Sequence, residues 1–187
     1  MQLSAFSQSA LEENIFFNLD DLSSDNVILR STVSDFFYLM GKPDAFTLNV
    51  QTPCNDTNHT IIVCDIYYYK NNNLTFKKID DKVYLKSIHF NKKNNLSIRH
   101  PKIVFNKELH IDNFIKIFSV PQDSIHLLKW FFIPFEVSHK HDYYEIVLLS
   151  ANNCHELITF YFDNKGHLLA IYFHWCPIKD FEKVEKK

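Results

Sequence analysis

Apolar side chains at helical spacing predict two helices near the start of the chain. Residues 8–22 contain no helix breaker, and Ser9 stands in a suitable N-cap position before a run of apolar residues. Residues 26–40 predict a second helix, capped by Ser24 or Asp25, whose apolar stripe consists of Val33, Phe36, Phe37 and Met40.

After Gly41, which ends the second helix, alternating β-branched and aromatic residues predict strands. Asn-rich turns separate most of the first four strands, which we expect at residues 45–51, 60–70, 82–90 and 96–105. A short helix over residues 113–118, capped by Asp112, comes next, followed by a helical turn that begins at Asp123 or Ser124. Three more strands are predicted at residues 143–150, 155–163 and 167–175.

The predicted elements occur twice in the same order, which indicates an internal repeat. Residues 34–43 align with residues 112–121, because each segment has a polar cap, an apolar helix face, a stop and a proline; residues 87–90 align in the same way with residues 170–173. We therefore predict an α+β fold in which an antiparallel sheet packs on helices, as a tandem repeat of a helix plus a three-strand unit. The expected parts of this one compact domain are an N-terminal helix (1–25), two repeats (26–110 and 111–178) and a frayed charged tail (179–187).

Two segments of the repeat carry a resemblance to known proteins: Met40–Asp44 at the end of the second helix, and Phe162–Leu169 in the last hairpin. The repeat resembles the helix-plus-three-strand unit of the BamE/SmpA outer-membrane lipoproteins and of the β-lactamase-inhibitor protein, which carries two such units in tandem. The second copy departs from the pattern, since Ser119 stands in place of the glycine. The Asn-rich, Gly-poor and aromatic composition is also similar to that of bacterial toxin-immunity proteins. These resemblances imply protein binding without catalysis.

The last predicted hairpin sets a register for its two strands. Residues Asp163 to His167 read as a tight loop, and if Asp163 faces His167, then Cys154 lies directly opposite Cys176. The two sulfur atoms would then be within reach of a disulfide bond. The alternative is that both are ordinary buried thiols in a reducing cytosol.

The same register divides the hairpin into two faces. One face is apolar at its centre and suits a helix-covered core: Ile158, Phe160, Phe162, Leu168, Ala170 and Tyr172. The other adds the polar-tipped aromatic rings that are common in protein interfaces: Thr159, Tyr161, Leu169, Ile171, Phe173 and Trp175. Residues 67–69 are three consecutive tyrosines of one predicted strand, and they cannot all point inward. We name Tyr67 and Tyr69, together with Tyr161 and Trp175 of the last hairpin, as candidate partner-binding residues.

Acidic residues gather near the N-terminus, and we add them to the candidate partner-binding residues: Glu12, Glu13, Asp20, Asp21 and Asp25. One interpretation is a solvated surface. The other is a docking patch for a basic partner such as a nuclease toxin, because charge complementarity speeds association.

Composition and motif spacing argue against several classes of function. The 187 residues include two glycines, too few for a phosphate-binding loop, a dinucleotide-binding turn or a nucleophile elbow. A net charge of −2 argues against nucleic-acid binding, and the lack of a long apolar run argues against membrane insertion.

No cofactor and no bound metal are expected from the sequence. His139 and His141 share a strand face, but spacing does not specify a third ligand, for which His155 or Glu156 are candidates. Glu156 would face His174 across the last hairpin, either as an acid–base couple or as a structural ion pair.

The first residues contain no basic segment and no long apolar core, so the chain as written is expected in the cytoplasm. If the segment Ser7–Ser9 marks a trimmed signal-peptide cleavage site, the protein is periplasmic instead. We expect a non-enzymatic inhibitor that binds a protein, specifically a bacterial immunity protein that occludes a cognate toxin. The alternatives are a BamE-like periplasmic assembly adaptor or envelope protein inhibitor, and a metal- or His/Glu-dependent enzyme.

Overall fold

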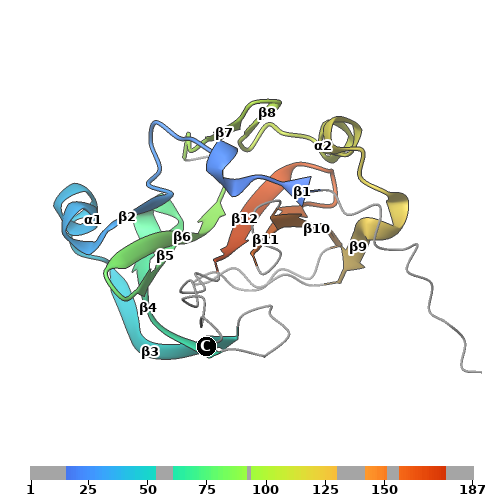
Figure 1. Ribbon diagram of the computed structural model, residues 1–187. Coiled ribbons are helices and arrows are strands. Elements are labelled where there is room, and N and C mark those ends of the chain that lie inside the picture. Colours follow the sequence, from blue (N-terminus) through green and yellow to red (C-terminus); the bar gives the residue numbers. More distant parts are fainter. Residues whose placement is uncertain (1–15, 54–60, 92–93, 130–141, 151–155, 176–187) are drawn as a thin grey trace, which may run out of the picture.

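A computed structural model describes residues 16–53, 61–91, 94–129, 142–150 and 156–175, and within these ranges most strands belong to a single sheet (Figure 1). The strand order is β1-β10-β11-β12-β6-β5-β4-β3, with β2 also paired to β6 and β9 also paired to β10. All of these neighbours are antiparallel except β1 and β10, and β7 and β8 form a separate hairpin. The predicted α+β fold with an antiparallel sheet is therefore confirmed.

The first part of the chain contains β1 (Phe16–Phe17), β2 (Arg30–Thr32), α1 (Val33–Met40), β3 (Ala45–Pro53), β4 (Ile61–Tyr69), β5 (Leu74–Ile79) and β6 (Lys82–His89). The second part contains β7 (Ile98–His100), β8 (Ile103–Phe105), α2 (Ile111–Phe118), β9 (Ile125–Leu128), β10 (Tyr143–Ser150), β11 (Leu157–Phe162) and β12 (Leu168–His174). Short 3-10 helices lie at Leu19–Asp21, Lys70–Asn72 and Gln122–Ser124. No helix in the described ranges is long and apolar enough to cross a membrane.

The two parts of the sheet meet where β6 pairs with β12. Three residue pairs form this sheet junction: His89 with Ala170, Ile88 with Ile171, and Ser87 with Tyr172. On one side α1 is followed by β3 to β6, and on the other α2 is followed by β9 to β12. Each helix thus precedes four strands rather than three, because β5 was not anticipated and β9 replaces most of the helical turn expected after Asp123 or Ser124. The duplication of one ancestral unit stays a prediction.

The second predicted helix begins seven residues later than expected, at Val33 instead of residue 26. Residues Arg30–Thr32 pair with β6, so their backbone is extended. The Thr32 hydroxyl accepts a hydrogen bond from the Asp35 N–H at 3.3 Å and takes the N-cap role assigned to Ser24 or Asp25. Ser24 closes a local turn instead, by accepting the N–H groups of the two residues that follow Asp25.

The predicted N-terminal helix is also wrong in the part that the structure describes. Phe16 and Phe17 form β1, which runs parallel to β10, and a 3-10 turn over Leu19–Asp21 follows. The Asn18 side chain caps this turn by accepting the Asp20 N–H at 3.0 Å. Phe17 is buried against aromatic rings of the core, so tertiary packing overrides the helical pattern.

The helix α2 begins two residues before the predicted start, because His110 rather than Asp112 is its N-cap. The His110 Nδ1 accepts the Asp112 N–H at 3.3 Å, and its Nε2 lies 2.9 Å from the carbonyl oxygen of Lys165. At the other end, Ser119 has a φ of 52° and donates its N–H to Ile115. Ser119 is therefore in the left-handed helical region, with a ψ of 43°, whereas Gly41 after α1 shares only the positive φ, 69°, and has a ψ of −159°.

Both helices pack on the same face of the sheet, where the main core forms. The α1 residue Phe36 lies with its ring centroid 4.7 Å from that of Phe76, and the α2 residue Phe114 lies 4.6 Å from Phe160. All four side chains are fully buried. Burial of each such ring contributes about 2 kcal/mol or more, so these contacts attach the helices to the sheet.

A β-bulge in the last hairpin overturns part of the predicted register. Phe162 pairs with Leu168 as expected. Tyr161 and the β11 residues before it each pair with a β12 residue one position later than predicted, because Leu169 is an extra residue. The predicted faces of β12 are therefore exchanged: Ile171 and Phe173 lie in the core, whereas Ala170 and Tyr172 lie on the other face. The register that placed Cys154 opposite Cys176 does not hold along β11, and both cysteines lie outside the described residues.

Gly166 is expected to be the glycine whose replacement is most damaging. Its φ is 84°, and a Cβ atom there would come within 2.6 Å of Nε2 of the His110 ring, which the N-cap holds in place. Gly166→Ala should lower the free energy of unfolding by about 2 kcal/mol or more. Chemical denaturation measures the change, and Asn164→Ala in the same exposed turn should be nearly neutral; equal effects would contradict the close approach.

The left-handed backbone at Ser119 predicts a stabilising substitution. Glycine adopts this conformation without the steric cost that a Cβ atom imposes, so Ser119→Gly should raise the free energy of unfolding by about 0.5–1 kcal/mol. Thermal and chemical denaturation measure the effect. Ser34→Gly, in the first turn of α1 with ordinary helical backbone, is the control and should be destabilising. A loss of stability in Ser119→Gly would contradict the prediction.

Candidate functional site

Most of the aromatic residues predicted to bind a partner are buried. Tyr67, Tyr69 and Trp175 are 8%, 5% and 7% exposed, so the expectation that they face outward is wrong. The two tyrosines lie under α1, where both contact the ring of Phe36, and the Tyr69 hydroxyl donates to the carbonyl oxygen of Gly41 at 2.8 Å. Burial raises the pKa of Tyr69 to about 12.

Trp175 fills the space next to the sheet junction. Its ring stacks on Phe173 with centroids 5.8 Å apart and lies 5.6 Å from the ring of Tyr84. The indole Nε1 donates to the carbonyl oxygen of Leu85 at 2.5 Å, at a position between the parts of β6 that pair with β12 and with β2. Trp175 therefore stabilises the fold and is not an accessible anchor.

Tyr161 differs from the other predicted residues, because it is only partly buried and lies on the face of the sheet opposite the helices. Its ring contacts Tyr172 at 5.4 Å, and the Tyr172 hydroxyl lies 3.2 Å from Nε2 of His89. Burial, and then the hydrogen bond and charge of Glu145, raise the pKa of Tyr161. Tyr161 stays a candidate contact residue within this polar aromatic cluster.

The acidic residues near the N-terminus interact with neighbouring polar and basic groups of the chain. Asp25 forms an ion pair with Arg99 at 2.5 Å, and Asp20 lies 3.8 Å from Arg30. The Asn18 side chain donates to Asp21 at 3.1 Å. These contacts weaken the case for an acidic docking patch, because part of the charge is already compensated; Glu12 and Glu13 lie outside the described residues.

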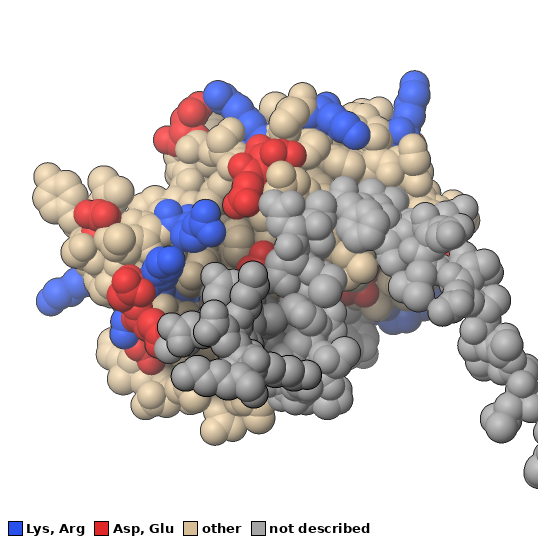
Figure 2. Space-filling view, in the orientation of Figure 1, with Lys and Arg blue, Asp and Glu red and all other residues tan. Residues whose placement is uncertain are grey.

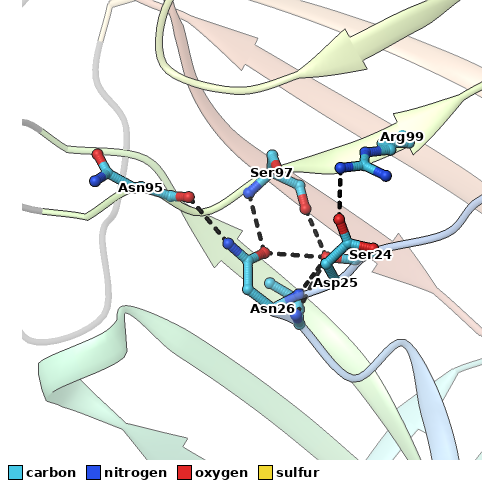
Figure 3. A network of polar contacts seen from close by, with 7 residues as sticks. Ser24, Asp25, Asn26, Asn95, Ser97 and Arg99 are labelled. Atoms are coloured by element: carbon cyan, nitrogen blue, oxygen red, sulfur yellow. Dashed lines mark hydrogen bonds and ion pairs between the residues drawn. The ribbon is translucent and has the colours of Figure 1, made fainter.

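Figure 3 shows that Asp25 belongs to a polar network that fastens the N-terminal segment to β7. The Ser24 hydroxyl donates to the carbonyl oxygen of Ser97 at 2.6 Å, and the Asn26 amide donates to that of Asn95 at 3.0 Å. Backbone bonds between Ser23 and Arg99 add to the attachment. The network is a structural clamp and explains why the segment before α1 is not helical.

The face of the sheet opposite the helices, here called the polar face, holds all of the buried polar residues of the described chain. Register partners Thr75, Ser87, Tyr172 and Thr159 form one row across four strands, and His89, Ala170 and Tyr161 form the next. The buried polar residues themselves are Thr75, Lys77, Ser87, His89 and Thr159. Buried polar groups are costly unless they are paired, so this face is the part of the sheet where a function is expected.

Three basic side chains converge on this face, and we call Lys77, Lys86 and His174 the basic cluster. Lys77 is 6% exposed, and its ammonium donates to the carbonyl oxygen of Trp175. Burial lowers its pKa to about 8. Burial also lowers the pKa of Lys86, the extra residue of a bulge in β6.

His174, the third member of the cluster, does not face Glu156 as predicted, because the register shift pairs it with Leu157. Its Nε2 lies 3.4 Å from the Thr159 hydroxyl. The residue is exposed, yet burial of the ring, and then the charges of Lys77 and Lys86, lower its pKa to about 4. The predicted metal pair His139 and His141 and the possible third ligand His155 lie outside the described residues. No group of three His, Cys, Asp or Glu side chains suited to a metal occurs within them.

An exposed apolar surface that the sequence reasoning missed lies at the β3 end of the sheet. We call it the apolar edge; it consists of Tyr38 and Leu39 of α1, Phe46 and Leu48 of β3, and Ile61 and Val63 of β4. Each is 54% exposed or more, and Tyr38 reaches 89%. Figure 2 shows uncharged residues along the lower left rim, where the end of β3 lies, with acidic and basic groups above them.

The signal for this surface was present in α1, where the apolar run Phe36–Met40 exceeds what one buried helix face accommodates. Phe36 points into the core and Phe37 covers Tyr67, so Tyr38 and Leu39 must face solvent. The register partner of Tyr67 is Phe46, which brings the strand part of the apolar edge next to the helix.

Comparison of the chain with protein-family models, with curated proteins and with solved structures found no match. The interpretation of the polar face and of the apolar edge therefore rests on the residues themselves.

The lowered pKa of Lys77 predicts a pH dependence of stability. In the unfolded chain the ammonium keeps its proton up to pH 10.5, whereas the folded chain releases it near pH 8, so stability should rise as the pH increases through this window. Relative to Lys77→Met, the wild-type free energy of unfolding should increase by about 2 kcal/mol between roughly pH 7 and pH 9.5.

Denaturation at a series of pH values measures this difference, and other titrating groups cancel in the comparison with the variant. Lys78→Met on the same strand is the control, because the Lys78 ammonium lies 3.4 Å from the Asp65 carboxylate. A difference between wild type and Lys77→Met that does not change with pH would contradict the buried ammonium.

Proposed function

We propose that this chain is a non-enzymatic protein-binding inhibitor that docks through the apolar edge, and specifically an immunity protein that occludes a cognate toxin. The observation that carries the proposal is the set of six large apolar side chains exposed on α1, β3 and β4. Six large apolar side chains exposed on three consecutive elements are typical of a protein-interaction site. Aromatic residues such as Tyr38 and Phe46 are the side chains that contribute most to such interfaces.

The geometry of β3 favours docking by side chains rather than by addition of a strand. β3 is the last strand of the sheet, and no strand of the described chain pairs with its outer edge. A bulge between Thr47 and Val50 interrupts the edge; within it, Asn49 has a φ of 55° and its N–H donates to Asp65 at 3.1 Å. Pro53, at the end of the strand, has no N–H to offer. The exposed side chains are thus presented on a strand without an extended pairing edge.

The order of elements supports the same proposal. A helix followed by four strands occurs on each side of the sheet junction, as expected if one unit was duplicated. The resemblance to tandem inhibitors and to immunity proteins then suggests occlusion of a partner without chemistry. A cytoplasmic location and the absence of a cofactor are part of the proposal.

Co-expression with the product of the directly adjacent gene tests the function. If the chain is an immunity protein, it should protect cells from that product and co-elute with it in size-exclusion chromatography. Failure of both protection and co-elution would overturn the proposal. Protection by enzymatic inactivation would leave a chemically modified toxin, which mass spectrometry detects, and would favour an enzyme.

The apolar edge predicts which substitutions abolish binding. Leu39→Ser combined with Phe46→Ser should weaken association with the partner at least about 100-fold, because both side chains are more than half exposed and lose only intermolecular contacts. The stability of the double variant should change by less than about 1 kcal/mol. Isothermal titration calorimetry and denaturation measure the two effects.

The matched control is Val104→Ser combined with Leu127→Ser, which removes two exposed apolar residues outside the apolar edge. The control should bind the partner as the wild type does. If both double variants bind equally well, the apolar edge is not the docking surface even where protection is observed.

A further inference from the structure

The basic cluster on the polar face holds more positive charge than the described chain compensates. Lys77 and Lys86 each act on the charge of His174, so the three groups lie within electrostatic reach of one another. Glu156 acts on Lys77, and the buried thiol of Cys64 lies close to both lysines. Among the described residues, the Lys86 ammonium has no hydrogen bond and no ion pair, unlike the neighbouring Lys78, which pairs with Asp65.

The uncompensated charge of the basic cluster is unfavourable when no ligand is bound. Removing an ammonium from water costs several kcal/mol unless a counter-charge or hydrogen bonds replace the lost solvation. A second ammonium nearby adds repulsion, and Lys86, the extra residue of the β6 bulge, has no register partner in the described part of the sheet. Groups placed in this way favour a negatively charged ligand.

We propose that Lys77, Lys86 and His174 form a binding site for a small oxyanion, of the chemical class of phosphate, sulfate or a carboxylate. The site is on the opposite face of the sheet from the apolar edge and does not depend on the proposed inhibitor function.

The hydrogen-bond donors match such a ligand. Lys77 uses one of its three N–H groups on the carbonyl oxygen of Trp175, and within the described ranges its other two and all three of Lys86 have no acceptor. The His174 imidazole and the Thr159 hydroxyl, 3.4 Å apart, add neutral donors at the end of β11 and β12. A tetrahedral oxyanion accepts several bonds at once, whereas a metal cation would be repelled by the two ammonium groups.

Access to the site comes from the exposed side of the cluster. His174 is exposed and Lys86 is half-buried, whereas Lys77 lies behind them with 6% exposure. An anion would therefore contact His174 and Lys86 first and then accept its remaining hydrogen bonds from Lys77. Trp175 positions this last group, because its carbonyl oxygen holds the ammonium while its indole is fixed to Leu85.

Inorganic phosphate is the probe for the test, with chloride at equal ionic strength as the reference. Phosphate should raise the melting temperature of the full chain and saturate, and isothermal titration should give one site per chain. Sulfate and acetate in parallel titrations distinguish a tetrahedral dianion from a carboxylate as the preferred ligand. Equal melting temperatures in all four salts would overturn the proposal.

Lys86→Met should weaken phosphate binding at least about tenfold, because it removes an ammonium that has no hydrogen bond or ion pair with the described residues. Lys82→Met, which removes an exposed charge from the same strand, should leave phosphate affinity unchanged. Equal losses in both variants would indicate nonspecific attraction and overturn the site.

If Lys86→Met fails to fold, NMR of the wild type decides the question. Bound phosphate should raise the apparent pKa of the His174 imidazole, because an adjacent anion favours the charged ring over the effects of Lys77, Lys86 and burial. His126 in β9 and His167 between β11 and β12 are exposed, and their ring proton resonances are internal references that should not shift when phosphate is added. A His174 titration that phosphate leaves unchanged would overturn the proposal.

Discussion

The pairing of β6 with β12 is the constraint on which the rest of the structure depends. Across the described chain, three residue pairs join two stacks of strands that are each much longer than the junction. Ile88 and Ile171, at its centre, are almost fully buried, so burial of these two side chains specifies the register. A slip by one residue would turn Ile171 toward the polar face and place Tyr172 in the core. Bulges at Lys86 and Leu169 lie on either side and confine the regular ladder to this short stretch.

The strands were the part of the fold that the sequence predicted well. Alternation of side chains is a local property, so β4, β6, β10, β11 and β12 were placed within two residues of their ends. The ends of the helices depended on partners that no local pattern reveals. Thr32 rather than Ser24 caps α1, because the residues before Thr32 are extended and pair with β6. Phe17 is in a strand rather than the predicted helix, because its ring packs in the core. One extra residue, Leu169, was enough to exchange the two faces of β12.

The candidate sites were harder to predict than the fold, and the reason is the position of α1. The sequence shows that tyrosines alternate along β4, but not which face a helix covers. Since α1 lies over Tyr67 and Tyr69, the residues with the most interface-like chemistry are buried, and the helix exposes Tyr38 and Leu39 in their place. The basic cluster was not predictable either, because Lys77 and Lys86 lie on the consecutive strands β5 and β6, whereas His174 comes much later in the sequence and meets them only through the pairing of β12 with β6.

The location of Trp175 gives the molecule an internal optical reporter. The indole lies between Phe173 and Tyr84 and is hydrogen-bonded to the β6 backbone, so its fluorescence depends on whether the two parts of the sheet stay joined. A shift of its emission to longer wavelength before the loss of β-sheet circular dichroism would mean that the two parts separate while each keeps its strands. With Trp130 replaced by phenylalanine, this single chromophore would reveal whether the sheet behaves as one cooperative unit or as two.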